Sequence, residues 1–176
     1  AFLFEGGRPA AVLVHGFPGT ALEMRPLGAE LQAAGWTASG LRLPGFGAEF
    51  RDLIFYDHQD WVDAINQECQ ALRSGGHHPL LLVGYSFGAA LALQAAAQMP
   101  VDGLVLIAPF LWREPAWGKF LGDTFRSLLP VAIHPFRHIP IDHPSLARRY
   151  QQYLPEIDLE NPDHMDELTH FQFPLA

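Results

Sequence analysis

The chain has 176 residues, of which 49% are hydrophobic and 17% are charged, a composition typical of a folded protein rather than a disordered segment. Its 19 acidic residues outnumber 11 basic ones, and the formal charge of −8 argues against nucleic acid as a partner, because phosphates require a basic surface. A chain of this length is expected to bury one core.

The first part of the chain alternates between short apolar runs and longer amphipathic segments. The apolar runs lack a period of two, as expected for strands covered on both faces. Residues 2–4 (FLF) are expected to form an edge strand that pairs with residues 10–15. The predicted strands are 10–15, 36–43, 80–84 and 103–108, and the predicted helices are 21–35, 59–73 and 87–99. This alternation predicts an α/β fold, with a mostly parallel sheet between helices.

The pattern changes after Pro109. Residues 110–176 hold eight of the fifteen prolines and contain no convincing strand. Helices are predicted at 114–129 and 145–154. We therefore divide the chain into a core, residues 1–109, and a helical lid inserted over the sheet, residues 110–176.

Residues 82–90, LVGYSFGAA, place a serine between two glycines where a predicted strand meets a predicted helix. In this context G-x-S-x-G is typical of a tight turn that lifts the serine hydroxyl clear of the sheet. Gly84 and Gly88 relieve crowding around a strained serine backbone. The amino end of the following helix favours negative charge beside Ser86. The pattern predicts that Ser86 is a nucleophile.

The segment His15-Gly16-Phe17-Pro18-Gly19 follows the first buried strand. Acyl transfer by a serine requires two N–H donors directed at the oxyanion of the tetrahedral intermediate. One donor is expected from the residue after the nucleophile, Phe87, and the other from this loop, at Phe17. We interpret His15 as a residue that bonds the loop backbone and not as a proton shuttle.

The segments HGFPGT, LRLPGFG and GYSFG, in this order, resemble the α/β-hydrolase superfamily. The similarity is greatest to small bacterial carboxylesterases and monoacylglycerol-lipase-like serine hydrolases. It implies an enzyme that cleaves small carboxylic esters through an acyl-enzyme on Ser86, without a cofactor or metal. Phe17, Phe110 and Trp112 are then expected to contact the substrate.

The sequence departs from the family in one respect. In the family the nucleophile is followed by an Asp or Glu and then a His, each after a further strand, and no such strand is predicted after residue 108. We expect the catalytic acid and base to lie outside this chain. The strand at 103–108 would then have an open edge, along which a companion chain or a second copy is expected to pair.

Other interpretations stay open. The chain could be a non-catalytic or incomplete hydrolase-fold binding module, or a thioesterase or lipase with the same mechanism. A histidine of the lid is a further candidate base, and we weigh these residues against plain lid packing: His134, His138, His143, His164 and His170. A metal site at the first three is disfavoured, because Pro135 and Pro140 interrupt helical spacing.

The cellular setting is predicted from what the sequence contains. Cys69 is the only cysteine, so no disulfide can form within the chain, which favours a reducing compartment. The first residues, AFLFEGGRPA, have neither the basic start nor the apolar core of a signal peptide. No apolar run is long enough to cross a bilayer. These features predict a cytoplasmic protein without stable membrane insertion.

Overall fold

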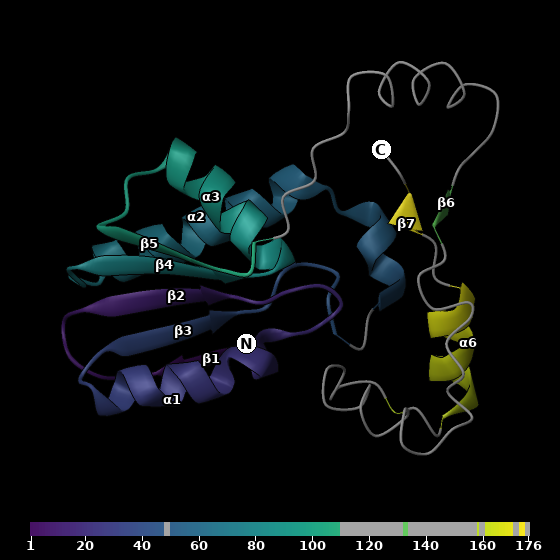
Figure 1. Cartoon of the computed structure of the whole chain (residues 1–176), viewed down its shortest axis with the longest axis horizontal. Helices are drawn as coiled ribbons and strands as arrows, with labels where there is room; N and C mark the ends of the chain where they lie inside the picture. The colour runs from purple at the N-terminus through teal and green to yellow at the C-terminus, as the bar shows by residue number, and fades with distance from the viewer. Residues whose placement is uncertain (48–49, 110–131, 134–157, 159–160, 171–172, 175–176) are drawn as a thin grey trace.

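The fold was analysed in a computed structural model, which describes residues 1–47, 50–109, 132–133, 158, 161–170 and 173–174. Five strands form one sheet in the order β1-β3-β2-β4-β5 (Figure 1). The β2, β3, β4 and β5 pairings are parallel, and β1 is antiparallel to β3. The strands are β1 (Phe2–Phe4), β2 (Ala10–Val14), β3 (Thr37–Leu41), β4 (Leu80–Tyr85) and β5 (Gly103–Ile107). The predicted α/β class, with a mostly parallel sheet, is confirmed.

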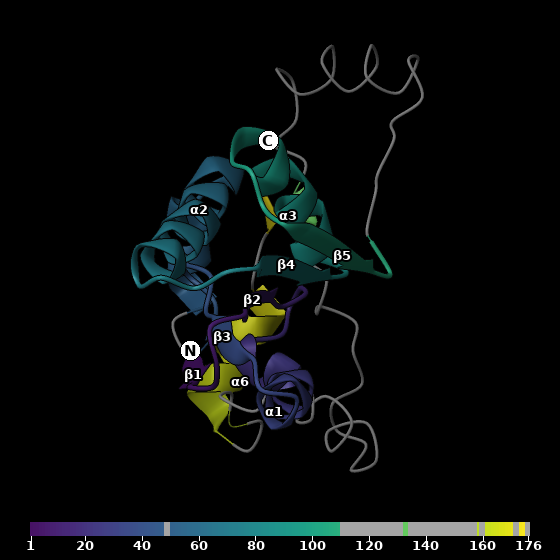
Figure 2. The ribbon, with the colours of Figure 1, turned by 90° about the vertical axis from the view of Figure 1, so that its left-hand side faces the viewer.

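Helices cover both faces of the sheet. Figure 2 shows α2 and α3 on one side and α1 on the other. Helix α1 has Pro26 in its first turn, and Gly35, just after its end, has a φ of 85°. Helix α2 begins with a capping box between Asp57 and Asp60. The helical segments of this part are η1 (Ala21–Met24), α1 (Arg25–Ala33), η2 (Phe50–Phe55), α2 (His58–Ser74) and α3 (Phe87–Gln98).

Strand β2 is buried along its whole length. Val12 and Val14 pack in the cluster formed with α2 and α3, whereas Ala11 and Leu13 pack in the cluster on the α1 side. Successive side chains of a strand point to opposite faces, so each face of β2 needs its own apolar set. The continuous apolar run in the sequence follows from this double burial.

The predicted partner of residues 2–4 is wrong. Strand β1 pairs with β3, not with β2, in a register that places Phe2 opposite Gly40. Both edges of β2 are already hydrogen-bonded, to β3 and β4, so no edge is left for β1. Gly40 also leaves room for the Phe2 ring, because a Cβ at residue 40 would overlap that ring.

The prediction of no strand in residues 110–176 is also wrong. Strands β6 (Ala132–Ile133) and β7 (Phe173–Pro174) pair in antiparallel fashion, and each is too short to show a period. Helix α6 (Pro162–His170) was not predicted, although Asn161 accepts from the Asp163 N–H and Pro162 opens the helix. The predicted helices 114–129 and 145–154 lie outside the described residues, so the lid stays a prediction.

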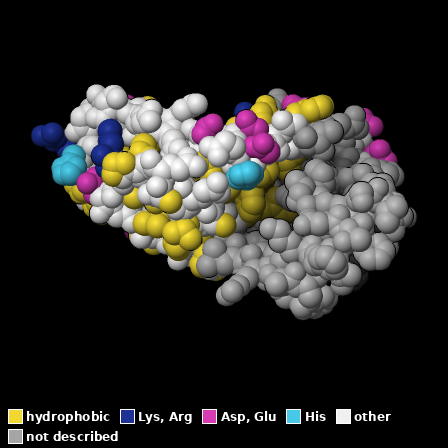
Figure 3. Space-filling view, turned by 90° about the horizontal axis from the view of Figure 1, so that it is seen from above, with side chains coloured by type: hydrophobic (Ala, Val, Ile, Leu, Met, Phe, Trp, Pro, Cys, Tyr) yellow, Lys and Arg dark blue, Asp and Glu magenta, His cyan; other side chains and the backbone are white. Residues whose placement is uncertain are grey.

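Among the described residues, strand β5 is paired along one edge. Within the part of the chain that the structure describes, β4 is its single pairing partner, and Val105 and Ile107 are 42% and 38% exposed. On the face seen in Figure 3, hydrophobic side chains lie in several groups separated by polar atoms and backbone. None of the described helices has both the length and the apolar character required of a membrane span.

Candidate functional site

Ser86 sits at the bend between β4 and α3. Its φ of 52° and ψ of −114° are strained values for a residue with a side chain. The bend is held by the Ser86 N–H, which donates to Ile107 O at 2.9 Å, and by the Ala89 N–H, which donates to Ser86 O at 3.1 Å. Ser86 is half-buried, in contrast to the fully buried Gly84 before it. The backbone has the bend that the sequence predicts.

The flanking glycines are required by the space around them. A Cβ on Gly84 would lie 2.5 Å from Ala89 Cα, on the first turn of α3. A Cβ on Gly88 would lie 2.6 Å from Val14 O, and closer still to His15 O. Real Cβ atoms do not approach backbone this closely. Gly84 therefore lets the first turn of α3 pack closely on β4, and Gly88 lets α3 begin directly against the end of β2.

The loop after β2 lies beside the nucleophile candidate. A Cβ on Gly16 would be 3.2 Å from Ser86 Cβ and 3.3 Å from Tyr85 O, so the loop backbone runs against Ser86. Phe17 follows Gly16 directly. Phe87 is the first residue of α3, where the helix offers its N–H no acceptor. The structure thus brings Ser86, Phe17 and Phe87 to one end of the sheet, and the role of the two amides stays a prediction.

An aromatic cluster joins the two residues whose amides are predicted to act. Phe46 is buried, and its ring centroid lies 6.1 Å from that of Phe17 and 6.4 Å from that of Phe87. It also packs edge-on against His15 at 4.9 Å and against Trp61 at 5.7 Å. Sequence reasoning assigned no role to Phe46, although it lies in the segment LRLPGFG. Its contacts cross between loops that are distant in sequence.

His15 links two loops and is buried completely. The Leu43 N–H donates to Nε2 at 3.2 Å, so Nε2 is an acceptor and the ring proton is on Nδ1, which donates to Gly16 O at 2.9 Å. Burial lowers the His15 pKa from 6.5 to about 4, and the imidazole is neutral at pH 7. With both nitrogens engaged, His15 bonds the loop backbone, as the sequence interpretation has it.

The His15 site makes stability depend on pH. An unfolded His15 binds a proton below about pH 6.5 and the folded one only near pH 4, so stability present above pH 6.5 is lost as the pH falls toward 4. The loss expected from this group is about 3 kcal/mol. Urea unfolding of the protein from pH 7.5 to 4.5 measures it. In His15→Gln the fall should be smaller, and in His58→Gln, a change at an exposed histidine, it should match the wild type. Equal slopes in all three proteins would contradict this assignment.

Glu23 is a further acid at this site, which sequence reasoning missed. The Gly16 N–H donates to Glu23 Oε1 at 2.5 Å. A Cβ on Gly19 would lie 2.5 Å from Glu23 Oε2, so the carboxyl occupies the space that Gly19 leaves. Burial raises the pKa of this carboxyl above its ordinary value. The only signal in the sequence is an acidic residue on the short helix after the HGFPG segment.

Residues 11–175, nearly the whole chain, match the alpha/beta hydrolase family. The chain belongs to this family. Its sheet order, the strained Ser86 and the loop at Gly16 are therefore features of an alpha/beta hydrolase.

Two relatives of this chain carry the names of enzymes that act on esters. A carboxylesterase of Bacillus subtilis is 30% identical over 59% of this chain, and a thermostable monoacylglycerol lipase of Bacillus sp. is 33% identical over 60% of it. The chain spans 42% of the length of each of these two relatives. Among solved structures, one chain from work on two metagenome-derived lipolytic enzymes, LipS and LipT, matches with a TM-score of 0.63 and 27% identity, over 75% of this chain and 54% of its own length.

The described residues include no base for Ser86. No described side chain hydrogen-bonds to the Ser86 hydroxyl, and His164 instead accepts from the Asp158 N–H at 3.1 Å. The other predicted residues lie where the structure describes no side chain: Phe110, Trp112, His134, His138, His143 and His170. An acid and a base outside this chain stay a prediction.

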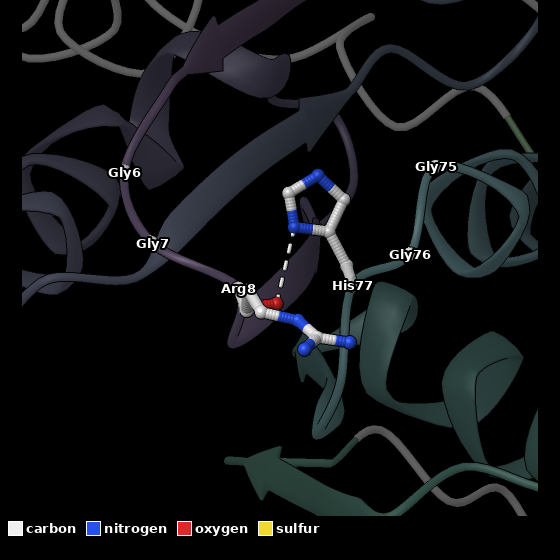
Figure 4. A pocket seen from close by; sticks show the side chains of 6 residues that line it. All are labelled: Gly6, Gly7, Arg8, Gly75, Gly76 and His77. Carbon is white, nitrogen blue, oxygen red and sulfur yellow. Dashed lines mark hydrogen bonds between the residues drawn. The ribbon is translucent and has the colours of Figure 1, made fainter.

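A shallow pocket lies at the other end of the sheet (Figure 4). Its lining comes from the segments that lead into β2 and β4, whereas Ser86 follows the carboxyl end of β4. Its glycine amides are used within the protein, because the Gly7 N–H donates to Gly35 O and the Gly76 N–H to Arg73 O. We assign it no part in the chemistry at Ser86. The lining residues are Gly6, Gly7, Arg8, Gly75, Gly76 and His77.

Proposed function

We propose that this alpha/beta hydrolase cleaves carboxylic esters of small molecules, with Ser86 as the nucleophile. The proposal rests on one observation above all: Ser86 occupies a strained φ of 52° between a strand and a helix, and the Gly16 backbone lies against it. A strained residue at a strand-to-helix turn is a known arrangement for an exposed nucleophile. The carboxylesterase and the monoacylglycerol lipase named above support esters as the substrate class.

The proposed reaction proceeds through an acyl-enzyme. Ser86 Oγ attacks the carbonyl carbon, and its proton passes to a histidine outside this chain. The N–H groups of Phe17 and Phe87 hold the oxyanion, and the amino end of α3 favours the same charge. The intermediate collapses as the alcohol leaves with the histidine's proton. Water then gives its proton to the same histidine and attacks the acyl carbon, the bond to Ser86 Oγ breaks, the carboxylic acid leaves, and Oγ takes the proton back.

The catalytic acid and base also need a place beside Ser86. In a parallel sheet, residues after the carboxyl ends of neighbouring strands meet at the same end of the sheet. A segment that extends the sheet beyond β5 would cover Val105 and Ile107 and bring its own loops to the Ser86 end. We propose that the acid and the base are carried by such a segment, on a longer chain or on a companion chain.

A fluorophosphonate probe tests the nucleophile directly. Ser86 Oγ would attack phosphorus and expel fluoride, which leaves a stable phosphonyl-serine. In the full-length protein that carries these 176 residues, we expect one adduct, located on the peptide with Ser86 by mass spectrometry. An unlabelled protein would favour the non-catalytic binding module, and an adduct on another residue would remove Ser86 as the nucleophile. Rates on matched oxygen esters and thioesters then separate an esterase from a thioesterase.

A further inference from the structure

We propose that Glu23 is a positioning residue, which holds the loop of residues 15–19 closed beside Ser86; this inference rests on the proposed function. Glu23 itself does not touch the reacting atoms. It acts through the backbone of the loop that carries Phe17.

The first contact is at the start of the loop. The Gly16 N–H donates to Glu23 Oε1, and a Cβ added on Gly16 would lie 3.2 Å from Ser86 Cβ and 3.3 Å from Tyr85 O, so the Gly16 backbone runs close to the nucleophile candidate. Gly16 is therefore fixed between the carboxyl and the nucleophile. The Phe17 amide nitrogen is joined to Gly16 by the peptide bond. A displacement of Gly16 therefore moves the predicted oxyanion donor relative to Ser86. A displacement of a catalytic group by about 1 Å is enough to lower the reaction rate by about 100-fold.

The second contact is at the end of the loop. The Glu23 carboxyl fills the space beside Gly19 that a side chain would need. The Glu23 N–H donates to Thr20 O at 3.1 Å, and Thr20 Oγ1 accepts from the Leu22 N–H at 3.3 Å. Thr20 is buried. The residue that holds the loop is thus anchored to the segment in which the loop ends.

These contacts give the two glycines different tasks. Gly16 lets the loop approach Ser86, whereas Gly19 makes room for the Glu23 carboxyl. A methyl group at residue 19 would displace the carboxyl without changing Glu23 itself. Gly19→Ala and Glu23→Ala should therefore break the same contact from opposite sides.

The test is a double-mutant cycle in the full-length protein, with kcat and KM measured on a short p-nitrophenyl ester. Glu23→Ala is expected to lower kcat by about 10- to 100-fold, the value of one hydrogen bond to a charged or buried group, with little change in KM. Glu23→Gln keeps an oxygen acceptor for Gly16 and should recover most of the rate. Gly19→Ala should resemble Glu23→Ala, and the double variant should be no slower than the slower single one. Glu30→Ala, at an exposed acid of α1, should match the wild type.

Several results would overturn the inference. They are an unchanged kcat in Glu23→Ala, equal losses in Glu23→Gln and Glu23→Ala, or costs that add in the double variant. If Glu23→Ala does not fold, Glu23→Gln and Gly19→Ala still give the comparison. The fluorophosphonate probe separates the two proposals. An unlabelled wild type contradicts the proposed function, whereas a labelled wild type and an equally fast-labelled Gly19→Ala contradict the role of Glu23 alone.

Discussion

Replacing Ser86 with alanine is expected to abolish ester hydrolysis while the protein stays folded. The predicted fall in kcat is on the order of 10⁵-fold or more, because without the hydroxyl no acyl-enzyme can form and only oxyanion stabilisation and binding remain. Alanine keeps the Cβ and the backbone bonds of the bend, so the thermal midpoint should change little. Initial rates on a short p-nitrophenyl ester, together with thermal unfolding, measure both quantities.

The control for this prediction is a serine that lies outside the site. Ser74 is exposed at the last position of α2, so Ser74→Ala should retain the full rate. A Ser86→Ala protein that keeps more than a tenth of the wild-type rate would remove Ser86 as the nucleophile.

Gly88→Ala is expected to disturb the junction of α3 with β2. The new methyl group would meet the carbonyl oxygens of Val14 and His15, and neither belongs to a flexible side chain. The helix must move away from the strand, at a cost of about 3 kcal/mol in the free energy of unfolding. The displacement also moves Phe87 and its amide, so the rate should fall as well. Urea unfolding and the ester assay on the same sample measure the two effects.

Gly75→Ala is the matched control for this change. Gly75 follows α2 with a φ of −72°, and an added Cβ would come no closer than 3.3 Å to Leu72 O. Such a substitution changes stability by about 1 kcal/mol or less. If Gly88→Ala were as stable as Gly75→Ala, α3 would not be seated against β2 as the structure has it.

The sequence predicts the fold where the local residue pattern matches what tertiary packing requires. The run at β2 is apolar without a period because two separate clusters bury it, and the glycines around Ser86 stand where backbones touch. The partner of β1 could not be read in this way. It depends on which edges the other strands leave open, and on the fit of Phe2 over Gly40, which are properties of the assembled sheet.

The site shows the same division. Ser86 and the loop at Gly16 were predictable, because their chemistry requires particular residues at adjacent positions. Glu23 and Phe46 act through contacts between segments, and their residue types alone have many ordinary uses. His15 lies between these cases: its motif places it at the site, but only its two hydrogen bonds determine where its proton resides.

The double burial of β2 restricts how this chain can change in length. A single inserted or deleted residue in Ala10–Val14 would exchange the side chains that enter the two clusters and would carry Gly16 out of reach of Ser86. Changes of length are instead expected in surface connections such as residues 75–79, at the end of the sheet opposite to Ser86. Homologues of different length should therefore keep the spacing within this strand and vary at that end of the sheet.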